Sequence, residues 1–291
     1  MEKKNTVDYS LHTHTIGFDG RNSVADMVAA ADARGMKTFG ISNHFIVHPH
    51  IKKSKMYEYA VRGGYSGIYS DNIENSVEKF ARHYDEVRAL RRKYPDMNIL
   101  CGMEMDWFKY DGWRDVVNYA VRRLHPDYVI GAMHFIDMGE DGVLNIHDIK
   151  QATPTETRKL LREYYQNLMQ LAEFDWRDME FQFNWIAHFD LPQKVGLSDT
   201  NMEIAALRAL KLNSVPLELN TRLINNINYT LKPEILAELS GATAILSDDA
   251  HDAVRIGANF DSVLDTMHGA GVKNICVSAD NLSKFVNIRS R

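Results

Sequence analysis

The sequence predicts an α/β protein that folds as one closed barrel of parallel strands. Short apolar runs alternate with longer segments of helical spacing along the whole chain, and repeated strand–helix units of this kind indicate parallel strands joined by right-handed crossovers. The 291 residues show no linker, repeat or break in composition, and αβ barrels of about 250 residues often form a single domain. We therefore expect one domain over residues 1–291.

Eight apolar runs are predicted to be the strands of this barrel. Each is short and rich in residues that suit a buried strand. In chain order the runs are Val7–His12, Thr38–Ser42, Asn98–Gly102, Tyr128–Met133, Asn184–His188, Pro216–Asn220, Thr243–Ser247 and Asn274–Val277. Seven or eight strand–helix units in succession favour a closed barrel over an open sheet.

The segments between the strands have the 3.6-residue apolar spacing of helices. The first begins at the capping candidate Ser23, and a later one starts just after Pro154, which is a typical first-turn residue. The predicted helices are Ser23–Gly35, Ile73–Tyr94, Trp113–Leu124, Thr155–Phe174, Asp199–Leu212, Pro233–Leu239 and Phe260–Gly269.

One insertion, Phe45–Asn72, is too long for a plain strand-to-helix turn and is rich in Tyr, Gly and Lys. Loops of this length are often active-site lids or disordered segments. We predict a lid-like loop here, in which Tyr57, Tyr59, Arg62 and Tyr65 close over a substrate. The alternative is that these four side chains are simply solvated.

Composition excludes several classes of protein. Hydrophobic residues make up 45% of the chain and charged residues 25%, which is ordinary for a globular protein and excludes disorder as the main state. The net charge of −5 with no basic block argues against nucleic acid as the main partner. No apolar stretch is long enough to span a membrane, and the polar N-terminus lacks a signal-peptide core. Because two cysteines cannot build a disulfide framework, we expect a cytoplasmic protein with Cys101 and Cys276 in its core.

Histidine and carboxylate residues follow six of the predicted strands at the points where the strands end. The loops after the carboxyl ends of barrel strands build the active site, and histidine with carboxylate suits zinc, manganese and iron. These residues are His12, His14, Asp19, His44, Glu104, His134, His188, Asp249 and His251. Nine ligands exceed one coordination sphere, so the pattern indicates two or three ions. Glu104 lies midway in the set and is expected to bridge two of them.

Each of these residues alone is more often a hydrogen-bonded structural residue than a metal ligand, and the number and placement of all nine favour the metal site. A second His-x-His, His48-Pro49-His50, lies inside the insertion, where a surface or lid role is expected. The remaining histidines are predicted to be solvated: His83, His125, His147 and His268.

The order of the motifs resembles that of the PHP superfamily, which is named for polymerase and histidinol phosphatase. The motifs are HTHT, NH, GMEMDW, YVIGAMHF, AHFD and SDDAH, from about Tyr9 to about His251. The Gly-x-Glu-x-Asp and DYVIGAMHF segments most resemble the histidinol-phosphate phosphatase branch. The resemblance implies a distorted (β/α)7 TIM-like barrel whose active site, at the C-terminal ends of the strands, holds two or three divalent ions (Zn, Fe or Mn).

The resemblance also implies how the ligands divide. One ion is expected at His12, His14, Glu104 and Asp249, a second at Glu104, His134 and His188, and a third at Asp19, His44 and His251. The chain departs from the family pattern at Asn43, at Asp248 and in the segment Asn220–Leu223, where an NTSG-type sequence is usual. These departures affect the expected substrate contacts and leave the ligand set complete.

The function that follows is that of a metal-dependent phosphomonoesterase, in which a hydroxide bridging two ions attacks phosphorus. The resemblance implies hydrolysis of L-histidinol phosphate to L-histidinol and phosphate. We expect Glu104 to act in catalysis through the metals and Asp19, Asp190 or His251 to assist the leaving group. The expected substrate-binding residues are Arg222, Arg158 and Asn220; a surface position is the alternative for either arginine.

Other functions stay open. A PHP phosphoesterase acting on a nucleotide or sugar phosphate is the nearest alternative, and a non-catalytic metal-binding protein is another. Nuclease or proofreading work is disfavoured because no basic groove or polymerase domain is visible. An amidohydrolase-like site is disfavoured because no lysine sits at the six ligand-bearing strand ends. The expected partner is a small phosphorylated substrate, with no nucleic acid and no membrane.

Overall fold

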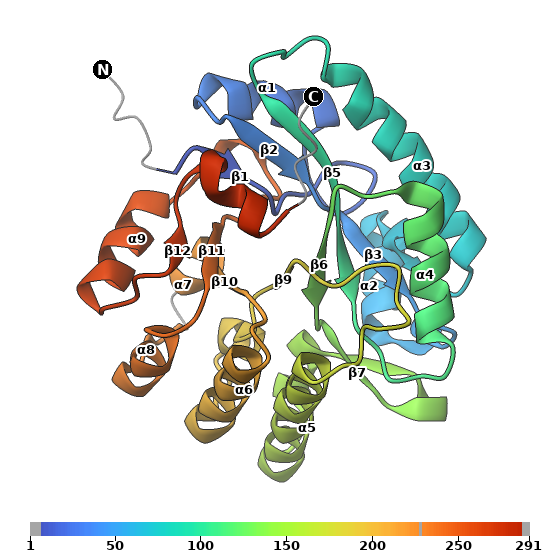
Figure 1. Ribbon diagram of the computed structural model, residues 1–291. Helices are drawn as coiled ribbons and strands as arrows, with labels where there is room; N and C mark the ends of the chain where they lie inside the picture. Colours follow the sequence, from blue (N-terminus) through green and yellow to red (C-terminus); the bar gives the residue numbers. More distant parts are fainter. Residues whose placement is uncertain (1–6, 227–228, 287–291) are drawn as a thin grey trace.

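A curled parallel sheet surrounded by helices forms the core of the protein (Figure 1). The computed structural model describes residues 7–226 and 229–286. Along the main path of the sheet the strands follow the order β1 (Tyr9–Ser10), β2 (Thr38–Ile41), β5 (Asn98–Asp106), β6 (Tyr128–Ala132), β9 (Trp185–Ile186), β10 (Leu217–Asn220), β11 (Ala244–Ser247) and β12 (Ile275–Cys276). Every pairing along this path is parallel. Seven of the eight predicted runs contain one of these strands, and β5 begins with the run Asn98–Gly102 but extends beyond it to Asp106.

The first strand of the path, β1, contacts the last two strands, β11 and β12. An isolated parallel bridge joins Thr13, just after β1, to Ala250, just after β11. The hydroxyl of Tyr9 donates to the carbonyl of Cys276 at 2.8 Å and accepts from the amide of Leu246 at 3.1 Å. The expected α/β fold with a curled parallel sheet is therefore confirmed. The count of seven units is not, because the path holds eight strands, of which β1, β9 and β12 have two residues each.

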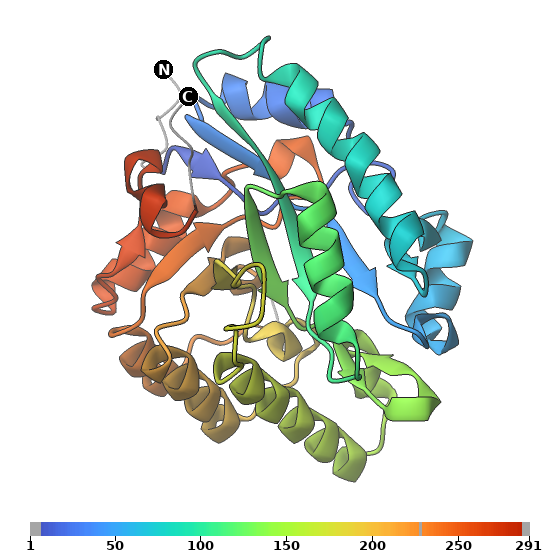
Figure 2. The same ribbon diagram turned by 45° about the vertical axis from the view of Figure 1, so that its right-hand side comes forward.

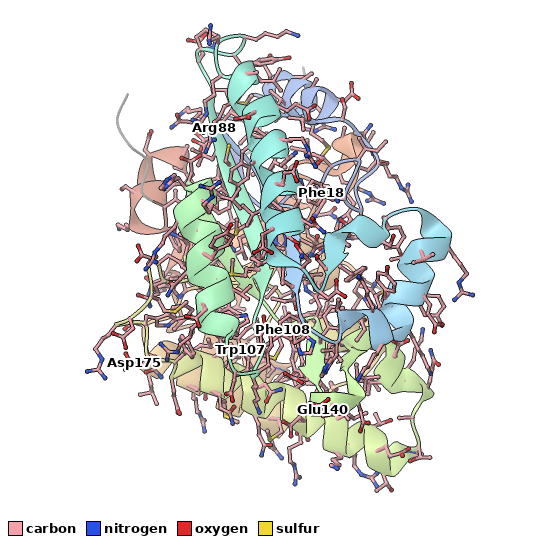
Figure 3. All side chains as sticks on the ribbon, turned by 90° about the vertical axis from the view of Figure 1, so that its right-hand side faces the viewer. Phe18, Arg88, Trp107, Phe108, Glu140 and Asp175 are labelled. Atoms are coloured by element: carbon pink, nitrogen blue, oxygen red, sulfur yellow. The ribbon has the colours of Figure 1, made fainter. Side chains whose placement is uncertain are left out.

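Helices surround the outside of the curled sheet (Figures 1 and 2). Seven lie in the predicted segments: α1 (Val24–Ala33), α3 (Ile73–Leu90), α4 (Trp113–Leu124), α5 (Pro154–Ala172), α6 (Thr200–Leu212), α8 (Pro233–Leu239) and α9 (Phe260–Gly269). Ser23 caps α1 through a capping box with Asp26. The last residues predicted for α3 form a turn instead, because helices usually end before the residue that precedes a proline, here Pro95. Figure 3 looks onto α3 and α4, which are joined where Arg88 donates to the last carbonyl of α4, that of Leu124, at 3.1 Å.

The segment Phe45–Asn72, predicted as a loop, is folded. β3 (His44–Val47) pairs in parallel with β5 and with β4 (Tyr69–Ser70), and α2 (Lys55–Gly63) lies between β3 and β4. β5 has nine residues, so its first half pairs with β2 and its second half with β3. Only Ser42 and Asn43 separate β2 from β3, and this close succession hides the second strand in the sequence.

An antiparallel hairpin, β7 (Phe135–Asp137) and β8 (Val143–Asn145), follows β6 and packs against this insertion. His48 Nε2 lies 3.4 Å from Asp137 Oδ2, and Lys53 donates to the carbonyl of Glu140 at 2.6 Å. A surface or lid role was expected for the His48–His50 pair; His48 is buried, so the surface alternative is wrong for His48. The two elements form one wall over the carboxyl ends of the strands.

The interior is one continuous hydrophobic core that includes Cys101 and Cys276, as predicted. The short helix α7 (Thr221–Ile224) completes the helices of the described residues. None of the helices in residues 7–226 and 229–286 has the length and apolar character needed to cross a membrane.

Candidate metal centre and its cavity

The fold brings all nine predicted ligands together at the carboxyl ends of the strands. Glu104 lies within β5, His44 is the first residue of β3 and follows closely on β2, and Asp19 lies in the loop between β1 and α1. The other six residues lie just after the ends of β1, β6, β9 and β11. Three groups have ligand atoms close enough to share an ion: His14, Asp19, His44 and His251; His12, His14 and Glu104; and His44, Glu104 and His134.

Glu104 is fully buried at the centre of the cluster, and its two oxygens face different histidines. Oε2 lies 2.8 Å from His44 Nδ1 and 3.2 Å from His12 Nε2. Oε1 lies 2.9 Å from His188 Nε2 and 3.5 Å from His134 Nε2. This is the arrangement that a carboxylate bridging two ions requires.

Asp19 and Asp249 complete the cluster on the side of the cavity. Asp19 Oδ2 lies 3.0 Å from His251 Nε2 and 3.2 Å from His44 Nε2. Asp249 Oδ1 lies 3.3 Å from His14 Nε2 and also 3.3 Å from His251 Nδ1. Each carboxylate therefore joins ligands from distant parts of the chain.

Several atoms of the cluster are buried without a hydrogen-bond partner, which is costly for polar atoms in a protein interior. They include both ring nitrogens of His14, His12 Nε2, His44 Nδ1, Glu104 Oε2 and Asp19 Oδ1. Imidazole and carboxylate donors suit divalent first-row ions, and such ions would satisfy these atoms. The described residues therefore fit the expected metal centre.

The electrostatics of the cluster also favour cations. Burial raises the pKa of Glu104, but His44, His12 and His134 outweigh it and hold the pKa well below its usual range. Burial, with His251 and His44 nearby, lowers the pKa of His14 to about 3. Glu104 is thus an anion and His14 is neutral at physiological pH, as metal ligands must be. The neighbouring carboxylates raise the pKa of His12 and His44 well above the usual value, so ions that bound here would displace protons from these two imidazoles.

Two ligands have unusual backbone conformations. Asp249 has φ of 44° and His188 has φ of 22°, and each lies two positions after the end of a short strand, β11 and β9 respectively. Non-glycine residues seldom occupy this region, and such strain clusters at functional sites. The strained turns direct both side chains inward, since Asp249 reaches His14 and His188 reaches Glu104.

Sequence reasoning missed two buried carboxylates that hold ligand histidines. Glu218 of β10 places Oε2 2.7 Å from His12 Nδ1. Asp106, at the end of β5, places Oδ2 2.9 Å from His134 Nδ1 and accepts from the amide of His134 at 2.8 Å through Oδ1. The period of two along a strand, which puts Asp106 on the same side as Glu104, is the signal that points to Asp106.

A cavity of about 320 Å³ opens beside the cluster. Six of the nine ligands line it: Asp19, His44, His134, His188, Asp249 and His251. The insertion adds Tyr65 and Tyr69, the β7–β8 hairpin and the turn after it add Asn145 and His147, and Lys194 and Arg222 add positive charge. Lys194 and His147 were not singled out from the sequence.

The proposed anion-binding residues differ in position. Arg222 lines the cavity, and its Nη1 lies 2.7 Å from His251 Nδ1 and 3.4 Å from Asp249 Oδ2. Arg158 is exposed on α5, donates to Thr155 at 3.5 Å and is not among the residues that line the cavity. Only Arg222 is therefore placed to contact a substrate in this cavity.

Asn220 and Asp190 are buried and engaged within the protein. Asn220 donates to Glu218 Oε1 at 2.9 Å, and its side-chain oxygen caps α7. Asp190 accepts from the hydroxyl of Tyr229 at 2.5 Å, and burial raises its pKa to about 7. Neither residue is among those that line the cavity, so neither is placed to contact a substrate there.

Two histidines expected to be solvated are not. His147 lines the cavity, and burial lowers its pKa to about 4. His83 is buried and lies 2.9 Å from Asn43 Nδ2 through Nε2. Asn43 in turn accepts from the amide of Thr15 at 2.8 Å, so His83 braces the loop that carries Asp19. His125 and His268 are exposed, as expected.

The match of the chain to a known protein family agrees with this geometry. The PHP domain family matches residues 8–222. The chain belongs to the PHP family. The matched region contains seven of the nine clustered residues, and Asp249 and His251 lie beyond it. No curated protein is significantly similar in sequence to this PHP protein.

Two solved structures share its fold. A protein assigned as the histidinol phosphatase HisK of Listeria monocytogenes is 17% identical, with a TM-score of 0.68 over 87% of this chain and 99% of that one. The histidinol phosphate phosphatase HisK of Lactococcus lactis, solved with zinc, L-histidinol and phosphate, is 18% identical, with a TM-score of 0.63 over 91% of this chain and 94% of that one. At these identities the likeness establishes the fold of this PHP protein.

Proposed function

We propose that this PHP protein is a metal-dependent phosphomonoesterase that hydrolyses a small phosphate ester. The observation that carries the proposal is Glu104, whose two oxygens face separate histidine groups, with His44, His134 and His188 of these groups lining a cavity that Arg222 also lines. We propose two or three ions of zinc, iron or manganese. The ligands would be His12, His14, Glu104 and Asp249; Glu104, His134 and His188; and Asp19, His44 and His251.

Such ions, when bound, supply Lewis acidity that activates water and offsets charge on phosphate oxygens. The chain's own residues supply the rest. Arg222 and Lys194 line the cavity beside the cluster and provide positive charge for the phosphate. Of the three residues expected to assist the leaving group, Asp19 and His251 line the cavity, whereas Asp190 is held by Tyr229 outside it. We therefore assign leaving-group protonation to the Asp19–His251 side of the cavity.

The substrate we propose first is L-histidinol phosphate. The fold likeness to two histidinol phosphatases, one solved with L-histidinol and phosphate, supports it. The cavity volume of about 320 Å³ suits a small ester. The rings of Tyr65, Tyr69 and Phe135 along its wall suit a flat group such as imidazole.

One observation favours the alternative, a sugar or nucleotide phosphate. Asp19 and Asp249 are the carboxylates among the described residues that line the cavity, and both belong to the proposed ligand set. No further carboxylate in that lining is left to pair with the ammonium group of histidinol. Lys194 and Arg222 instead favour a leaving group that is neutral or anionic.

A panel of substrates tests the proposal. The protein is loaded separately with zinc, manganese and iron, and phosphate release is measured from histidinol phosphate, p-nitrophenyl phosphate, sugar phosphates and nucleoside monophosphates. Preference for histidinol phosphate supports the first substrate, and preference for sugar phosphates or nucleotides supports the second. Absence of phosphate release from every ester, at full metal occupancy by elemental analysis, contradicts the phosphatase proposal and favours a non-catalytic metal-binding role.

A further inference from the structure

Two ligand histidines of the cluster, His12 and His134, each contact a buried carboxylate through the ring nitrogen that points away from Glu104. His12 presents Nε2 to Glu104 Oε2 and Nδ1 to Glu218, 2.7 Å away. His134 presents Nε2 to Glu104 Oε1 and Nδ1 to Asp106, 2.9 Å away. Each oxygen of Glu104 therefore faces a histidine whose other ring nitrogen contacts a second buried carboxylate.

We infer that Asp106 and Glu218 are positioning residues for the metal centre, each fixing the tautomer that leaves Nε2 of its histidine free to bind an ion. A neutral imidazole carries its hydrogen on one nitrogen and accepts on the other. A carboxylate at Nδ1 accepts that hydrogen, so Nε2 becomes the ligand atom. Partners of this kind orient metal-bound histidines and raise their basicity. The inference rests on the proposed metal centre and not on the substrate.

The two carboxylates are built into the protein in different ways. Asp106 contacts a single residue with both oxygens, since Oδ1 accepts from the backbone amide of His134 and Oδ2 faces its ring. Glu218 is shared: its Oε2 also accepts from the indole of Trp185 at 3.3 Å, and its Oε1 accepts from Asn220 at 2.9 Å. Both side chains are almost fully buried, with residue exposures of 2% and 1%.

His14 provides a contrast within the same cluster. Both of its ring nitrogens are buried without a hydrogen-bond partner, and they face Asp19 and Asp249, which are themselves proposed ligands. No buried carboxylate outside the proposed ligand set contacts His14 among the described residues. The paired carboxylates are thus specific to His12 and His134 and not a general consequence of burying histidine.

The difference between the two sites gives opposite expectations for the amide variants. In Asp106→Asn, the amide oxygen must stay on the backbone N–H of His134, because a backbone N–H only donates. The new amide NH₂ then faces Nδ1, which must accept, so the hydrogen moves to Nε2 and blocks the ligand atom. A similar tautomer reversal explains the large effect of an Asp-to-Asn change in the serine protease triad.

In Glu218→Gln, the amide oxygen is expected to stay at the position shared by Trp185 and His12, because the indole N–H also only donates. The NH₂ then meets the amide of Asn220, whose own oxygen is committed to capping α7. The tautomer of His12 is kept, and the losses are the negative charge and the hydrogen bond from Asn220, which is replaced by a contact between two donors. We therefore expect a smaller effect on metal binding here than at Asp106.

The experiment compares both variants with a matched control, Glu203→Gln, another buried carboxylate that contacts Tyr165 and Gln193 but no ligand. Metal affinity is measured by competition with a fluorescent zinc chelator, and the histidine tautomers of metal-free protein by long-range ¹H–¹⁵N NMR. We expect Asp106→Asn to weaken the affinity for one ion about a hundredfold and to move the ring hydrogen of His134 to Nε2. We expect Glu218→Gln to weaken the affinity for one ion about tenfold and to leave the tautomer of His12 unchanged.

Unchanged zinc affinity in both variants, or an unchanged His134 tautomer in Asp106→Asn, overturns the inference. So does a loss of zinc affinity of the same size in Glu203→Gln. If Asp106→Asn does not fold, the affinity measured for Glu218→Gln decides the outcome alone. Because neither readout uses phosphate release, an inactive wild type that shows the expected affinities and tautomers contradicts the phosphatase proposal and leaves this inference standing.

Discussion

Nη1 of Arg222 lies 2.7 Å from Nδ1 of His251. A guanidinium only donates, so Nδ1 accepts this hydrogen bond in the described geometry, and Nε2 lies 3.0 Å from Asp19 Oδ2. For a neutral His251 to bind an ion through Nε2, its hydrogen would have to sit on Nδ1, where the carbonyl of Asp249, 3.0 Å away, can accept it in place of the contact with Arg222. Arg222 thus belongs to the same hydrogen-bonded group as two proposed ligands. Through these contacts a cation that lines the cavity is connected directly to residues of the candidate metal centre.

Arg222→Met is expected to lower kcat/KM for the best phosphate ester by about 10- to 100-fold, because charge-assisted hydrogen bonds contribute about 1.5–3 kcal/mol. Arg158→Met, an arginine exposed on α5 outside the cavity lining, is the matched control and should leave kcat/KM unchanged. Steady-state kinetics checks both variants. Equal losses in the two would show that Arg222 has no specific role in binding phosphate.

Glu104→Gln should remove two ions at once, since its two oxygens face separate histidine groups. The amide of glutamine has the size of the carboxylate, but its NH₂ only donates hydrogen bonds. The side of the amide that faces one of the two histidine groups could therefore no longer bind an ion. We expect elemental analysis to show a loss of about two ions per chain, with Glu203→Gln retaining the wild-type content. Metal content equal to that of the wild type would refute the bridging position.

Removal of the metals should destabilise the fold. Buried ligand atoms such as Glu104 Oε2 and His14 Nδ1 have no other hydrogen-bond partner, and an ion that binds only the folded state stabilises it by about 2.7 kcal/mol at a concentration of 100 times its Kd. Treatment with a chelator should lower Tm by several degrees, and added zinc or manganese should restore it. An unchanged Tm after verified metal removal would contradict this expectation.

Tyr65 tests the proposed lid role of the insertion. It lines the cavity, whereas Tyr59 is 42% exposed, lies under Arg62 and is outside the lining. Tyr65→Ala should raise KM about tenfold with little change in metal content, because a lost aromatic contact is worth about 0.5–1.5 kcal/mol beyond its buried area. Tyr59→Ala should behave like the wild type. Kinetic constants that are identical for the two variants would argue against a substrate-contacting lid.

His83 should make stability depend on pH. Burial lowers its pKa to about 4, below the ordinary value of about 6.5, so the unfolded chain binds the proton more readily. Its contribution is complete above about pH 6.5 and is lost as the pH falls towards 4, by about 3 kcal/mol in all. Denaturant unfolding of metal-free wild type and His83→Gln should show this difference. Parallel stability curves for the two proteins would contradict it.

Most of the framework was predictable because buried parallel strands and amphipathic helices have strong local patterns. Trp113–Leu124, Pro233–Leu239 and Phe260–Gly269 were predicted with their observed bounds. The short strands β3 and β4 were not, because their pairing depends on the length of β5 and not on local sequence. The hairpin β7–β8 was missed for the same reason, since its three-residue strands carry little pattern of their own.

The ligand residues were predictable because their chemical types recur at strand ends, where the barrel fold makes them converge. The residues around them were harder to foresee. Lys194 and His147 reach the cavity from a 3₁₀ turn (Leu191–Val195) and from the turn after β8, whose paths depend on tertiary packing. Arg158 shows the opposite case. Its position near the start of a helix suggested a substrate-binding residue, but its side chain is exposed on the outer surface of α5.

The contacts between the first and last strands of the sheet join residues that are synthesised at very different times. Ser10 and Asp248, 238 residues apart, are hydrogen-bonded, and Thr13 bridges Ala250 just beside them. A nascent chain emerging from the ribosome holds His12 and His14 well before it gains their partners Asp249 and His251, which follow much later in the sequence. If the proposed ions bind as a full set, they can do so only after the chain has been synthesised as far as His251.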